Sequence, residues 1–424
     1  MKALVIGGGI GGMAAALSLE AAGIQVEVFE QVPNFKANGA GINLQPNAVR
    51  ELTELGLSEE LHSIAIETST LGYYNRFGQT IWSEPRGRAA GYAWPQYSID
   101  RGDLQMILLT ATQARTSDYC VYNGHRLVSF EQSSGGVTAN FIDVNTGKTL
   151  PSHTGDVLVG ADGIHSMVRA RLYPEEGLPV PSGRIQWRGV VEAEPFLDGR
   201  SHVTIGSRNC RAVVYPISER ARQRGRSLIN WVTVLAQQMA SDKPARWDRR
   251  ASKKRFFQHF EGWNFDWLPF ADLVTATAEI LEFPECDRDP LPRWSFGRAT
   301  LLGDAAHPMW PVGSQAGSQA VVDARVLALA LATSASVEEG LGLYERQRLP
   351  VMNEIIQKNR EFGPSIIMDL AEERAPAGFV NIEDVILRDE LEEISRSFKI
   401  VAGLEPETLN RRPSYTAKAA NDDD

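Results

Sequence analysis

The sequence predicts an α/β fold with a parallel-sheet domain, an antiparallel β-sheet domain and a helical C-terminal region. Three observations lead to this prediction. Residues 2–30 have the pattern of strand, helix and strand around a glycine-rich turn, β-branched and aromatic runs fill residues 70–97 and 186–283, and residues 304–396 are mostly helical in pattern. Because a strand-helix-strand unit runs its two strands parallel, the first domain is expected to contain a parallel sheet.

The first unit consists of an apolar strand at Lys2–Ile6 and a helix at Ile10–Ala22 that is rich in Ala, Leu and Met. Gly23 ends the helix, and an alternating strand follows at Ile24–Phe29. The whole unit spans about thirty residues, which is the usual size of a βαβ unit.

A glycine turn, Gly7-x-Gly9-x-x-Gly12, lies between that strand and that helix. The first glycine allows the tight turn, the second admits a pyrophosphate, and the third allows the helix to pack closely on the strand. Glu30 ends the second strand, where a carboxylate accepts hydrogen bonds from ribose hydroxyls. Glycine-rich turns are common. Here, however, the turn lies between a strand and a helix, and an acidic residue ends the next strand, and this combination predicts a Rossmann-like dinucleotide site. It leaves the identity of the dinucleotide open.

The remaining segments alternate between two kinds of domain. Helices are expected at Pro46–Leu55 and Gly102–Ala114, and buried strands at Asp156–Gly160 and Thr300–Asp304. Clustered aromatic residues with glycine turns predict antiparallel strands between them, with one helical stretch near Ser252–His259.

These patterns divide the chain into two domains and a tail. A discontinuous cofactor domain with C-terminal helices is expected at 1–70, 98–185 and 285–400, and a substrate-binding β-sheet domain at 71–97 and 186–284. The polar residues 401–424 are expected to form a mobile tail.

Composition places the chain among soluble globular proteins. Of its 424 residues, 43% are hydrophobic and 23% are charged, so a large buried core is available. The formal net charge is −10, and no cluster of Lys and Arg is present, which argues against a nucleic-acid partner. No stretch approaches the roughly 18 consecutive apolar residues that cross a bilayer. We expect a cytoplasmic monomer or homodimer with small-molecule ligands and no membrane span.

The three cysteines, Cys120, Cys210 and Cys286, are odd in number and widely spaced. This pattern fits neither a disulfide framework nor a set of metal ligands. We therefore expect a reducing compartment and no metal site.

Two further segments resemble a known family. Residues 155–163, which end in Asp162-Gly163, resemble the "DG" motif of the class A flavoprotein monooxygenases with the para-hydroxybenzoate hydroxylase fold. The run from Gly303-Asp304 to Asp323-Ala324 resembles the "GD" motif of the same family. The resemblance covers most of residues 1–360.

Within that family, residues 186–189 and 307–311 are similar to the phenazine hydroxylase and salicylate-hydroxylase-like branch. One departure is visible at Ser314-Gln315, where relatives more usually carry Gly or Asn. This departure is expected to alter flavin contacts or the roof over the substrate.

The resemblance implies a GR2-type FAD-binding domain with FAD held tightly but non-covalently. It places Asp304 at the ribityl chain, Arg101 at the phosphate and ribityl region, and a helix start after Gly313 at the pyrimidine edge of the flavin. Without the resemblance, Asp304 is an ordinary helix cap and Arg101 an ordinary surface residue. The residues expected to contact the cofactor are Gly7, Gly9, Ile10, Gly11, Gly12, Glu30, Gln31, Gly41, Ile42, Arg101, Leu127, Asp162, Asp304, Pro311, Gly313, Ser314, Gln315 and Ala316.

The resemblance also implies the reaction. NADH or NADPH reduces the flavin and departs, because no second GxGxxG motif is present to hold it. Reduced flavin and O2 then give a C4a-hydroperoxide, which hydroxylates a small aromatic or heteroaromatic substrate with or without decarboxylation.

Apolar walls are expected around that substrate, because water must be excluded from the reaction. Candidate lining residues are Tyr73, Trp187, Tyr215, Trp310 and Pro311. Arg188, His202 and Asn230 are polar candidates for orienting a carboxylate or phenol, and the catalytic candidates are His307, Arg188 and Tyr215. Each of these residues could instead be an ordinary core or surface residue. In this family the position of His307 more often has a structural role.

Other readings stay open. An FAD-dependent oxidase or reductase of the same fold differs only in pocket shape and in the fate of oxygen, and a non-catalytic flavin-binding protein shares the same motifs. Flavin-dependent halogenases fit less well, because no Trp-x-Trp-x-Ile-Pro motif occurs among the nine tryptophans.

Overall fold

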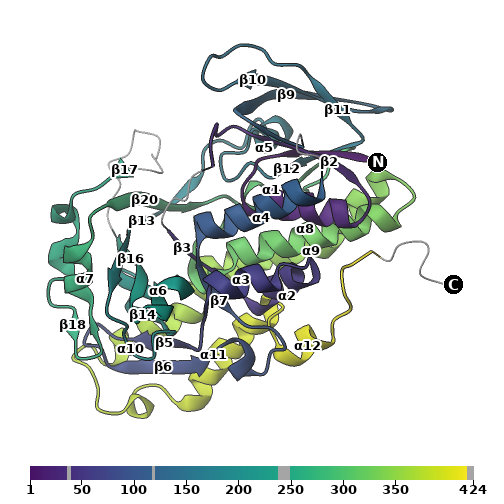
Figure 1. The fold of residues 1–424 in the computed structure, drawn as a ribbon. Coiled ribbons are helices and arrows are strands. Elements are labelled where there is room, and N and C mark those ends of the chain that lie inside the picture. Colours follow the sequence, from purple (N-terminus) through teal and green to yellow (C-terminus); the bar gives the residue numbers. More distant parts are fainter. Residues whose placement is uncertain (36–39, 117–119, 237–248, 418–424) are drawn as a thin grey trace.

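The computed structural model describes residues 1–35, 40–116, 120–236 and 249–417 (Figure 1). Its parallel sheet has the strand order β21-β12-β1-β2-β8, and every neighbouring pair is parallel. The strands are β1 (Lys2–Ile6), β2 (Gln25–Glu30), β8 (Val121–Asn123), β12 (Val157–Gly160) and β21 (Ala299–Leu301). The central strands are apolar and buried because both faces of the sheet are covered. The predicted parallel sheet is confirmed.

Helices cover one face of this sheet, and a small antiparallel sheet covers the other (Figure 1). Helix α1 (Ile10–Ala21) contacts both α4 (Arg101–Arg115) and α8 (Ala316–Thr333), and α8 also contacts α2 (Pro46–Glu54) and α9 (Val337–Arg360). Many alanines of α1 and α8 are fully buried, and their small side chains let the two helices approach closely. The small sheet consists of β9 (His125–Ser133), β10 (Gly136–Asp143) and β11 (His153–Gly155).

The second large sheet has eight strands in the order β17-β20-β13-β16-β15-β14-β5-β6. Neighbouring strands are antiparallel except β5 and β14, which are parallel. The expected antiparallel sheet is therefore present, with one parallel pair. The strands are β5 (Thr70–Tyr74), β6 (Thr80–Pro85), β13 (Val180–Ala193), β14 (His202–Gly206), β15 (Cys210–Pro216), β16 (Ser227–Ala236), β17 (Arg249–Arg250) and β20 (Ile280–Asp287).

The two faces of the eight-stranded sheet differ in chemistry, because side chains alternate along each strand. One face carries Trp187 and Trp231, which are fully buried in a core that includes α7 (Phe270–Ala276). The opposite face, which we call the polar face, contacts Gly41 and Phe362. Its residues include Arg184, Gln186, Arg188, His202, Thr204, Arg211, Tyr215 and Asn230.

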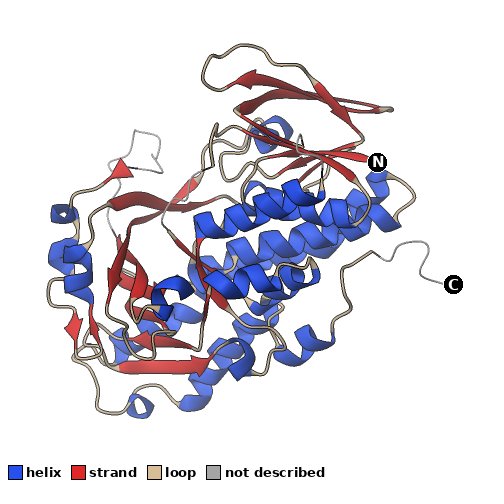
Figure 2. Cartoon of the chain, in the orientation of Figure 1, coloured by secondary structure: helices blue, strands red, loops and turns tan. Residues whose placement is uncertain are grey.

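Shorter elements connect these layers, and Figure 2 shows the main group of helices under the parallel sheet and beside the larger one. In the last part of the chain, Ile367 and Leu391 join Tyr73 and Ile81 in a separate small core. The C-terminal helices thus pack on the eight-stranded sheet. The remaining elements are β3 (Gly41–Leu44), β4 (Ile66–Glu67), β7 (Tyr97–Asp100), β18 (Asn264–Phe265), β19 (Leu268–Pro269), α3 (Ser58–Ile64), α5 (Met167–Leu172), α6 (Glu219–Gln223), α10 (Ile366–Arg374), α11 (Arg388–Val401) and α12 (Pro406–Arg411).

Several expected boundaries differ from the structure. The domain limits at 185/186 and 284/285 fall inside β13 and β20, because these strands pair with each other along the sheet from Val180 to Asp287. The helical stretch expected near Ser252–His259 consists instead of two short 3-10 turns. Phe256 and Phe260 are both buried in the core there, although the backbone around them is not a regular helix.

The segment expected to be a mobile tail has defined structure as far as residue 417. Helix α12 follows α11, and Leu404 and Leu409 are buried. Arg412 pairs with Glu51 of α2. The prediction of a tail starting at 401 was wrong for these residues, because two apolar side chains in a polar stretch suffice to attach it. Residues 418–424 lie outside the described part of the chain.

Within the described residues, no helix combines the length and the apolar character that crossing a membrane requires.

Candidate functional site

The sequence motifs meet at the carboxyl-terminal edge of the parallel sheet. Strands β1, β12 and β21 are parallel neighbours, so the residues that follow them, Gly7, Ala161 and Leu302, lie on one edge. A Cβ placed on Gly7 would lie 2.4 Å from the carbonyl oxygen of Ala161, and one on Gly11 would lie 3.0 Å from Leu302. The glycine turn is therefore in direct contact with the two later motifs. In open α/β sheets this edge is where nucleotides bind.

The glycine turn has the geometry of a dinucleotide cradle. Gly7 adopts a left-handed φ of +106°, and a Cβ on Gly12 would lie 1.9 Å from the carbonyl oxygen of Gly7. Only glycine allows α1 to begin this close to β1. A Cβ on Gly9, in contrast, would meet no atom within 4 Å. Gly9 precedes Ile10 at the start of α1 and offers no side-chain cap, so the open space there fits an anion at the helix end.

Glu30 lies at the end of β2, where backbone groups orient its carboxylate. Oε2 accepts a hydrogen bond from the N–H of Gly8 at 2.6 Å, and Oε1 accepts one from the N–H of Val32 at 2.7 Å. Each oxygen retains a second lone pair that can accept from a hydroxyl. The neighbouring Gln31 is exposed.

The GD segment places an exposed carboxylate before an uncapped helix. Asp304 is exposed in a single 3-10 turn. Further along, Gly313 and Ser314 have left-handed φ values of +69° and +53°. Helix α8 then begins at Ala316 with no side-chain cap, so its first N–H groups are open to an electron-rich partner. A left-handed backbone favours Gly or Asn, and Ser314 holds the same conformation without being either.

Strand β3 joins the two large sheets beside that helix start. The N–H of Gly41 donates to Oδ1 of Asn230 at 2.7 Å, and a Cβ on Gly41 would lie 2.5 Å from the ring of Tyr215. A Cβ on Gly317 would lie 2.7 Å from Cδ1 of Ile42. Close approach at these two glycines therefore brings β3 onto the polar face and α8 onto β3.

Three predicted cofactor residues have different surroundings. Asp162 accepts hydrogen bonds from Oγ of Ser166 at 2.5 Å and from the N–H of Met167 at 2.7 Å, so its carboxylate caps α5. Burial raises the pKa of Asp162, although these hydrogen bonds oppose the rise. Leu127 is buried in the core of the parallel-sheet domain. Arg101, the first residue of α4, is exposed to solvent.

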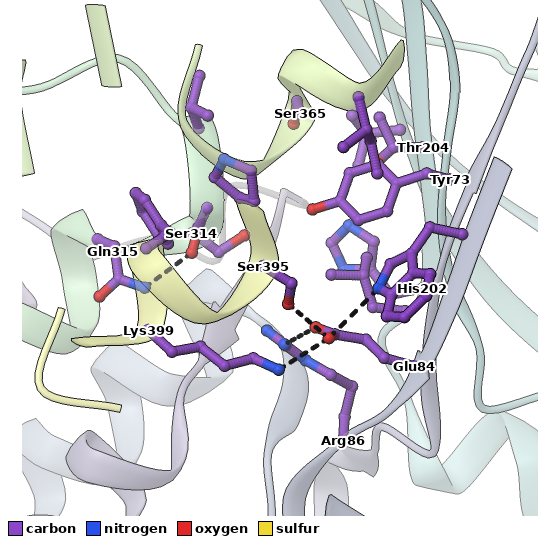
Figure 3. Close-up of a pocket in the computed structure, with 18 of the residues that line it drawn as sticks. Tyr73, Glu84, Arg86, His202, Thr204, Ser314, Gln315, Ser365, Ser395 and Lys399 are labelled. Carbon is purple, nitrogen blue, oxygen red and sulfur yellow. Dashed lines mark hydrogen bonds and ion pairs between the residues drawn. The ribbon is translucent and has the colours of Figure 1, made fainter. Parts of the chain in front are cut away.

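A cavity lies between the Pro311–Gln315 loop, the polar face and α11 (Figure 3). It encloses about 850 Å³ of empty space, part of which opens to solvent. Of the predicted residues, Tyr73, His202, Pro311, Gly313, Ser314 and Gln315 line it. Its apolar lining includes Leu71, Trp82, Val213, Ile367, Leu391 and Phe398.

An ion cluster forms one end of this cavity (Figure 3). The carboxylate of Glu84 accepts hydrogen bonds from Nζ of Lys399 at 2.8 Å, Oγ of Ser395 at 2.7 Å and a guanidinium N–H of Arg86 at 2.7 Å. Burial by itself raises the pKa of Glu84, but the attraction of Arg86 and Lys399 outweighs that effect and lowers it. Glu84 is therefore ionised and balances one of the two cations.

His202 and Tyr215 stack on the polar face with their ring centroids 4.8 Å apart. Burial, assisted by the charge of Arg86, lowers the pKa of His202 to about 3. Burial raises the pKa of Tyr215 to about 12. Near neutral pH both rings are therefore uncharged, and Tyr215 is a hydrogen-bond donor and not a base.

Several predicted lining residues lie elsewhere. Trp187 is fully buried on the apolar face, stacked on Phe256, and its indole N–H donates to Glu282 at 2.9 Å. Its prediction as a substrate contact was wrong, because the strand alternation turns it away from the cavity. Trp310 lies under the guanidinium of Arg184 at 4.5 Å and outside the cavity lining. Arg188 lies on the polar face, where its charge interacts with Tyr215, and it too is outside the lining.

His307 is fully buried away from the cavity. Its Nε2 lies 2.5 Å from Oδ2 of Asp323, and Arg348 donates to Oδ1 of the same carboxylate at 2.7 Å. Burial opposes the charge of Asp323, but the attraction of His307 and Arg348 outweighs it and lowers the pKa of Asp323. This triad connects the GD turn to α8 and α9, so the structure supports the structural alternative for His307 and not the catalytic one.

Sequence reasoning missed the charged residues of the cavity. Glu84 lies on β6, Arg86 directly follows that strand, Arg211 lies on β15 and Lys399 on α11, and no motif marks them. The available signal was the alternation of polar and apolar residues along β6 and β15. This alternation predicts that one side of the sheet is polar, but it does not predict that a cavity lies on that side. Among the described residues, no group of three or more His, Cys, Asp and Glu side chains is placed to hold a metal ion.

Comparisons with known proteins give a consistent result. A family model described as "FAD binding domain" matches residues 1–359. The phenazine 1,6-dicarboxylic acid hydroxylase PhzS of Lysobacter antibioticus is 44% identical over 362 residues, covering 84% of this chain and 89% of the relative. The 3-hydroxybenzoate 6-hydroxylase of Polaromonas naphthalenivorans is 30% identical over 379 residues, covering 86% of this chain and 87% of the relative.

Solved structures share the fold. A salicylate hydroxylase substrate complex superimposes with a TM-score of 0.72 at 23% identity, covering 99% of both chains. A variant of HpxO from Klebsiella pneumoniae in complex with FAD superimposes with a TM-score of 0.75 at 23% identity, covering 96% of this chain and 100% of the other.

Proposed function

The chain belongs to the family with this FAD binding domain, and from that premise we propose that it oxygenates a fused-ring heteroaromatic acid of the phenazine carboxylic acid type. It is an FAD-dependent aromatic monooxygenase that draws reducing equivalents from NADH or NADPH. The observation that carries the proposed substrate class is the cavity beside the Pro311–Gln315 loop. It combines apolar walls with the cations Arg86, Arg211 and Lys399.

The residues at the sheet edge support a definite placement of the cofactor. In this proposal the pyrophosphate of FAD lies at Gly9 and the uncapped start of α1, and the adenosine ribose lies at Glu30. The ribityl chain lies near Asp304 and Arg101. The flavin ring lies between β3 and the first N–H groups of α8, which stabilise negative charge on its pyrimidine edge.

FAD, when bound, supplies hydride acceptance and activation of O2. The protein must then exclude water and hold the ring carbon of the substrate in reach. Trp82, Val213 and Phe398 provide apolar walls for the first task. The cations provide orientation for the second. The eight-stranded sheet, whose strands lie within residues 70–85 and 180–287, is the proposed substrate-binding domain.

Turnover with defined acids tests the proposal. Purified holoenzyme is incubated aerobically with NADH or NADPH and, in parallel, with phenazine-1,6-dicarboxylic acid, phenazine-1-carboxylic acid, salicylate and 3-hydroxybenzoate. We expect a phenazine acid to accelerate nicotinamide oxidation most and to gain one oxygen atom, with or without loss of its carboxyl group. Faster turnover of the single-ring acids, or a product that lacks new oxygen, contradicts the proposal.

A further inference from the structure

Arg211 is a buried arginine on the wall of the cavity, and its charge interacts with Glu285, which it shares with a second arginine, and with Asp369, which pairs with Arg208. It lies on β15 two residues before Val213, which lines the same cavity. Its side chain is 5% exposed, and it approaches the carboxylate of Glu285 at 3.5 Å. Arg184 pairs with the same carboxylate at 2.5 Å. Two buried guanidinium groups thus share one carboxylate.

The guanidinium of Arg211 is held in a fixed plane. Its Cζ lies 4.8 Å from the ring centroid of Phe362, and Arg208 lies over the same ring at 5.0 Å. Phe362 has a left-handed φ of +75°, a conformation that costs a bulky residue of the order of 1 kcal/mol or more and persists only where its surroundings enforce it. The ring is almost fully buried. A rigid platform of this kind orients the guanidinium before any ligand arrives.

One donor of this group lacks an acceptor. The Nε of Arg211 is buried and has no hydrogen-bond partner among the described residues. A guanidinium presents adjacent N–H groups whose spacing matches the two oxygens of a carboxylate. The hydroxyls of Tyr73, Thr204 and Ser365 line the same cavity, and burial raises the pKa of Tyr73 above its usual range, so that it stays a donor.

The ion cluster at one end of the cavity already contains its own anion. There the carboxylate of Glu84 accepts hydrogen bonds from Arg86 and Lys399, and Arg86 also donates to Gln96, whereas the Nε of Arg211 has no acceptor among the described residues. Figure 3 shows Tyr73 and Ser365 away from this ion cluster, with Ser314 and Gln315 of the loop along a third side. A flat ring anchored near Tyr73 and Ser365 therefore lies with one edge toward that loop.

We propose that Arg211 binds the carboxylate of the aromatic substrate and so determines which ring carbon faces the flavin. The assignment rests on the proposed function, because it takes the substrate to be an aromatic acid. It makes the enzyme selective for acids over amides, and it makes Arg211 a determinant of regiochemistry.

Binding of matched acids and amides tests this assignment. Perturbation of the flavin absorbance is titrated in the holoenzyme with phenazine-1-carboxylic acid and with phenazine-1-carboxamide, for the wild type and for Arg211→Met, Arg211→Lys and Arg184→Met. A charge-assisted pair predicts that Arg211→Met raises the Kd of the acid about 10- to 100-fold. The Kd of the amide should change less than about threefold, and Arg211→Lys should recover part of the acid affinity. Arg184→Met leaves Glu285 to Arg211 alone, so it should weaken the acid less than Arg211→Met does and leave the Kd of the amide unchanged.

The acid-to-amide ratio separates recognition from folding, because loss of folding or of FAD weakens both ligands together. An equal loss for acid and amide in Arg211→Met, or no loss at all, overturns the assignment. A wild type that binds and oxygenates the amide as well as the acid also overturns it while leaving the monooxygenase activity standing. A wild type that oxygenates neither compound, and also fails to oxygenate phenazine-1,6-dicarboxylic acid, contradicts the proposed function itself.

Discussion

The ammonium of Lys399 and the carboxylate of Glu84, which are 315 positions apart in the sequence, form an ion pair of 2.8 Å. Ser395, one turn earlier in α11, donates to the same carboxylate at 2.7 Å. Strand β6 and helix α11 are thereby joined across one end of the cavity. Helix α11 also places Phe398 against the Pro311–Gln315 loop, since a Cβ on Gly313 would lie 2.6 Å from that ring.

Removal of this ion pair should loosen α11. We expect Lys399→Met to lower the free energy of unfolding by about 1–2 kcal/mol at pH 7, because Glu84 keeps Arg86 and Ser395 as partners. The pKa of Glu84 is lowered from its ordinary 4.5, so the pair stabilises the fold above that pH and is lost as the pH falls through the folded value. Urea unfolding at pH 7 and pH 4 measures both effects.

The surface pair of Lys358 with Glu361 is the control, and Lys358→Met should cost less than about 0.5 kcal/mol. Equal stability of Lys399→Met and the wild type at pH 7 would refute the role of the pair.

Gly9 offers a direct test of where FAD binds. A Cβ at this position meets no atom of the protein within 4 Å, so Gly9→Ala should leave the unfolding free energy of the FAD-free protein within about 1 kcal/mol of the wild type. If the pyrophosphate approaches the start of α1 here, the added methyl group should raise the Kd of FAD at least about tenfold. Fluorescence titration of the FAD-free protein gives this Kd. Unaltered FAD affinity would place the pyrophosphate elsewhere.

The buried His202 should make stability depend on pH. Its folded pKa of about 3 lies below the ordinary 6.5, so the unfolded chain takes up a proton between these values that the folded chain does not. Its contribution to stability is therefore complete above pH 6.5 and is lost as the pH falls, by about 1.4 kcal/mol per pH unit.

The comparison is made with His202→Asn. Between pH 7 and pH 5, the wild type should lose about 2 kcal/mol more of its unfolding free energy than the variant does. His259→Asn, at an exposed histidine, should retain the loss of the wild type. Identical losses in the wild type and His202→Asn would show that the ring is not buried in its neutral form.

His307 should be required for stability and not for proton transfer. In His307→Asn, Asp323 keeps Arg348 but loses its second buried partner, and we expect a loss of about 2–4 kcal/mol of unfolding free energy with reduced FAD content. Activity per bound FAD should keep the pH profile of the wild type. A stable variant with a changed pH profile would instead establish His307 as a general base.

The glycine turn and the sheet edge on which it lies could be predicted from the sequence, because their signals are local and each follows from a backbone contact. Gly7 and Gly12 permit a contact that a Cβ would block, and Glu30 ends the strand that follows them. The order of parallel strands then brings the residues after Gly160 and Leu301 to the same edge, although the sequence separates them by over a hundred positions.

The cavity could not be predicted in the same way. Alternation along β13 shows that Trp187 and Arg188 face opposite sides, but either side could have been the core. Glu84 meets Lys399 only after β6 and α11 have packed together. Contacts of this kind depend on tertiary packing, which leaves no spacing rule in the sequence.

The matched family region ends at residue 359, whereas Ser395, Phe398 and Lys399 line the cavity from α11. If this cavity holds the substrate, as proposed, selection on substrate choice can act on the last helices without changing the glycine turn at the sheet edge. On the same proposal, exchange of α11 between relatives should change the ring preference and leave the oxygen chemistry unchanged.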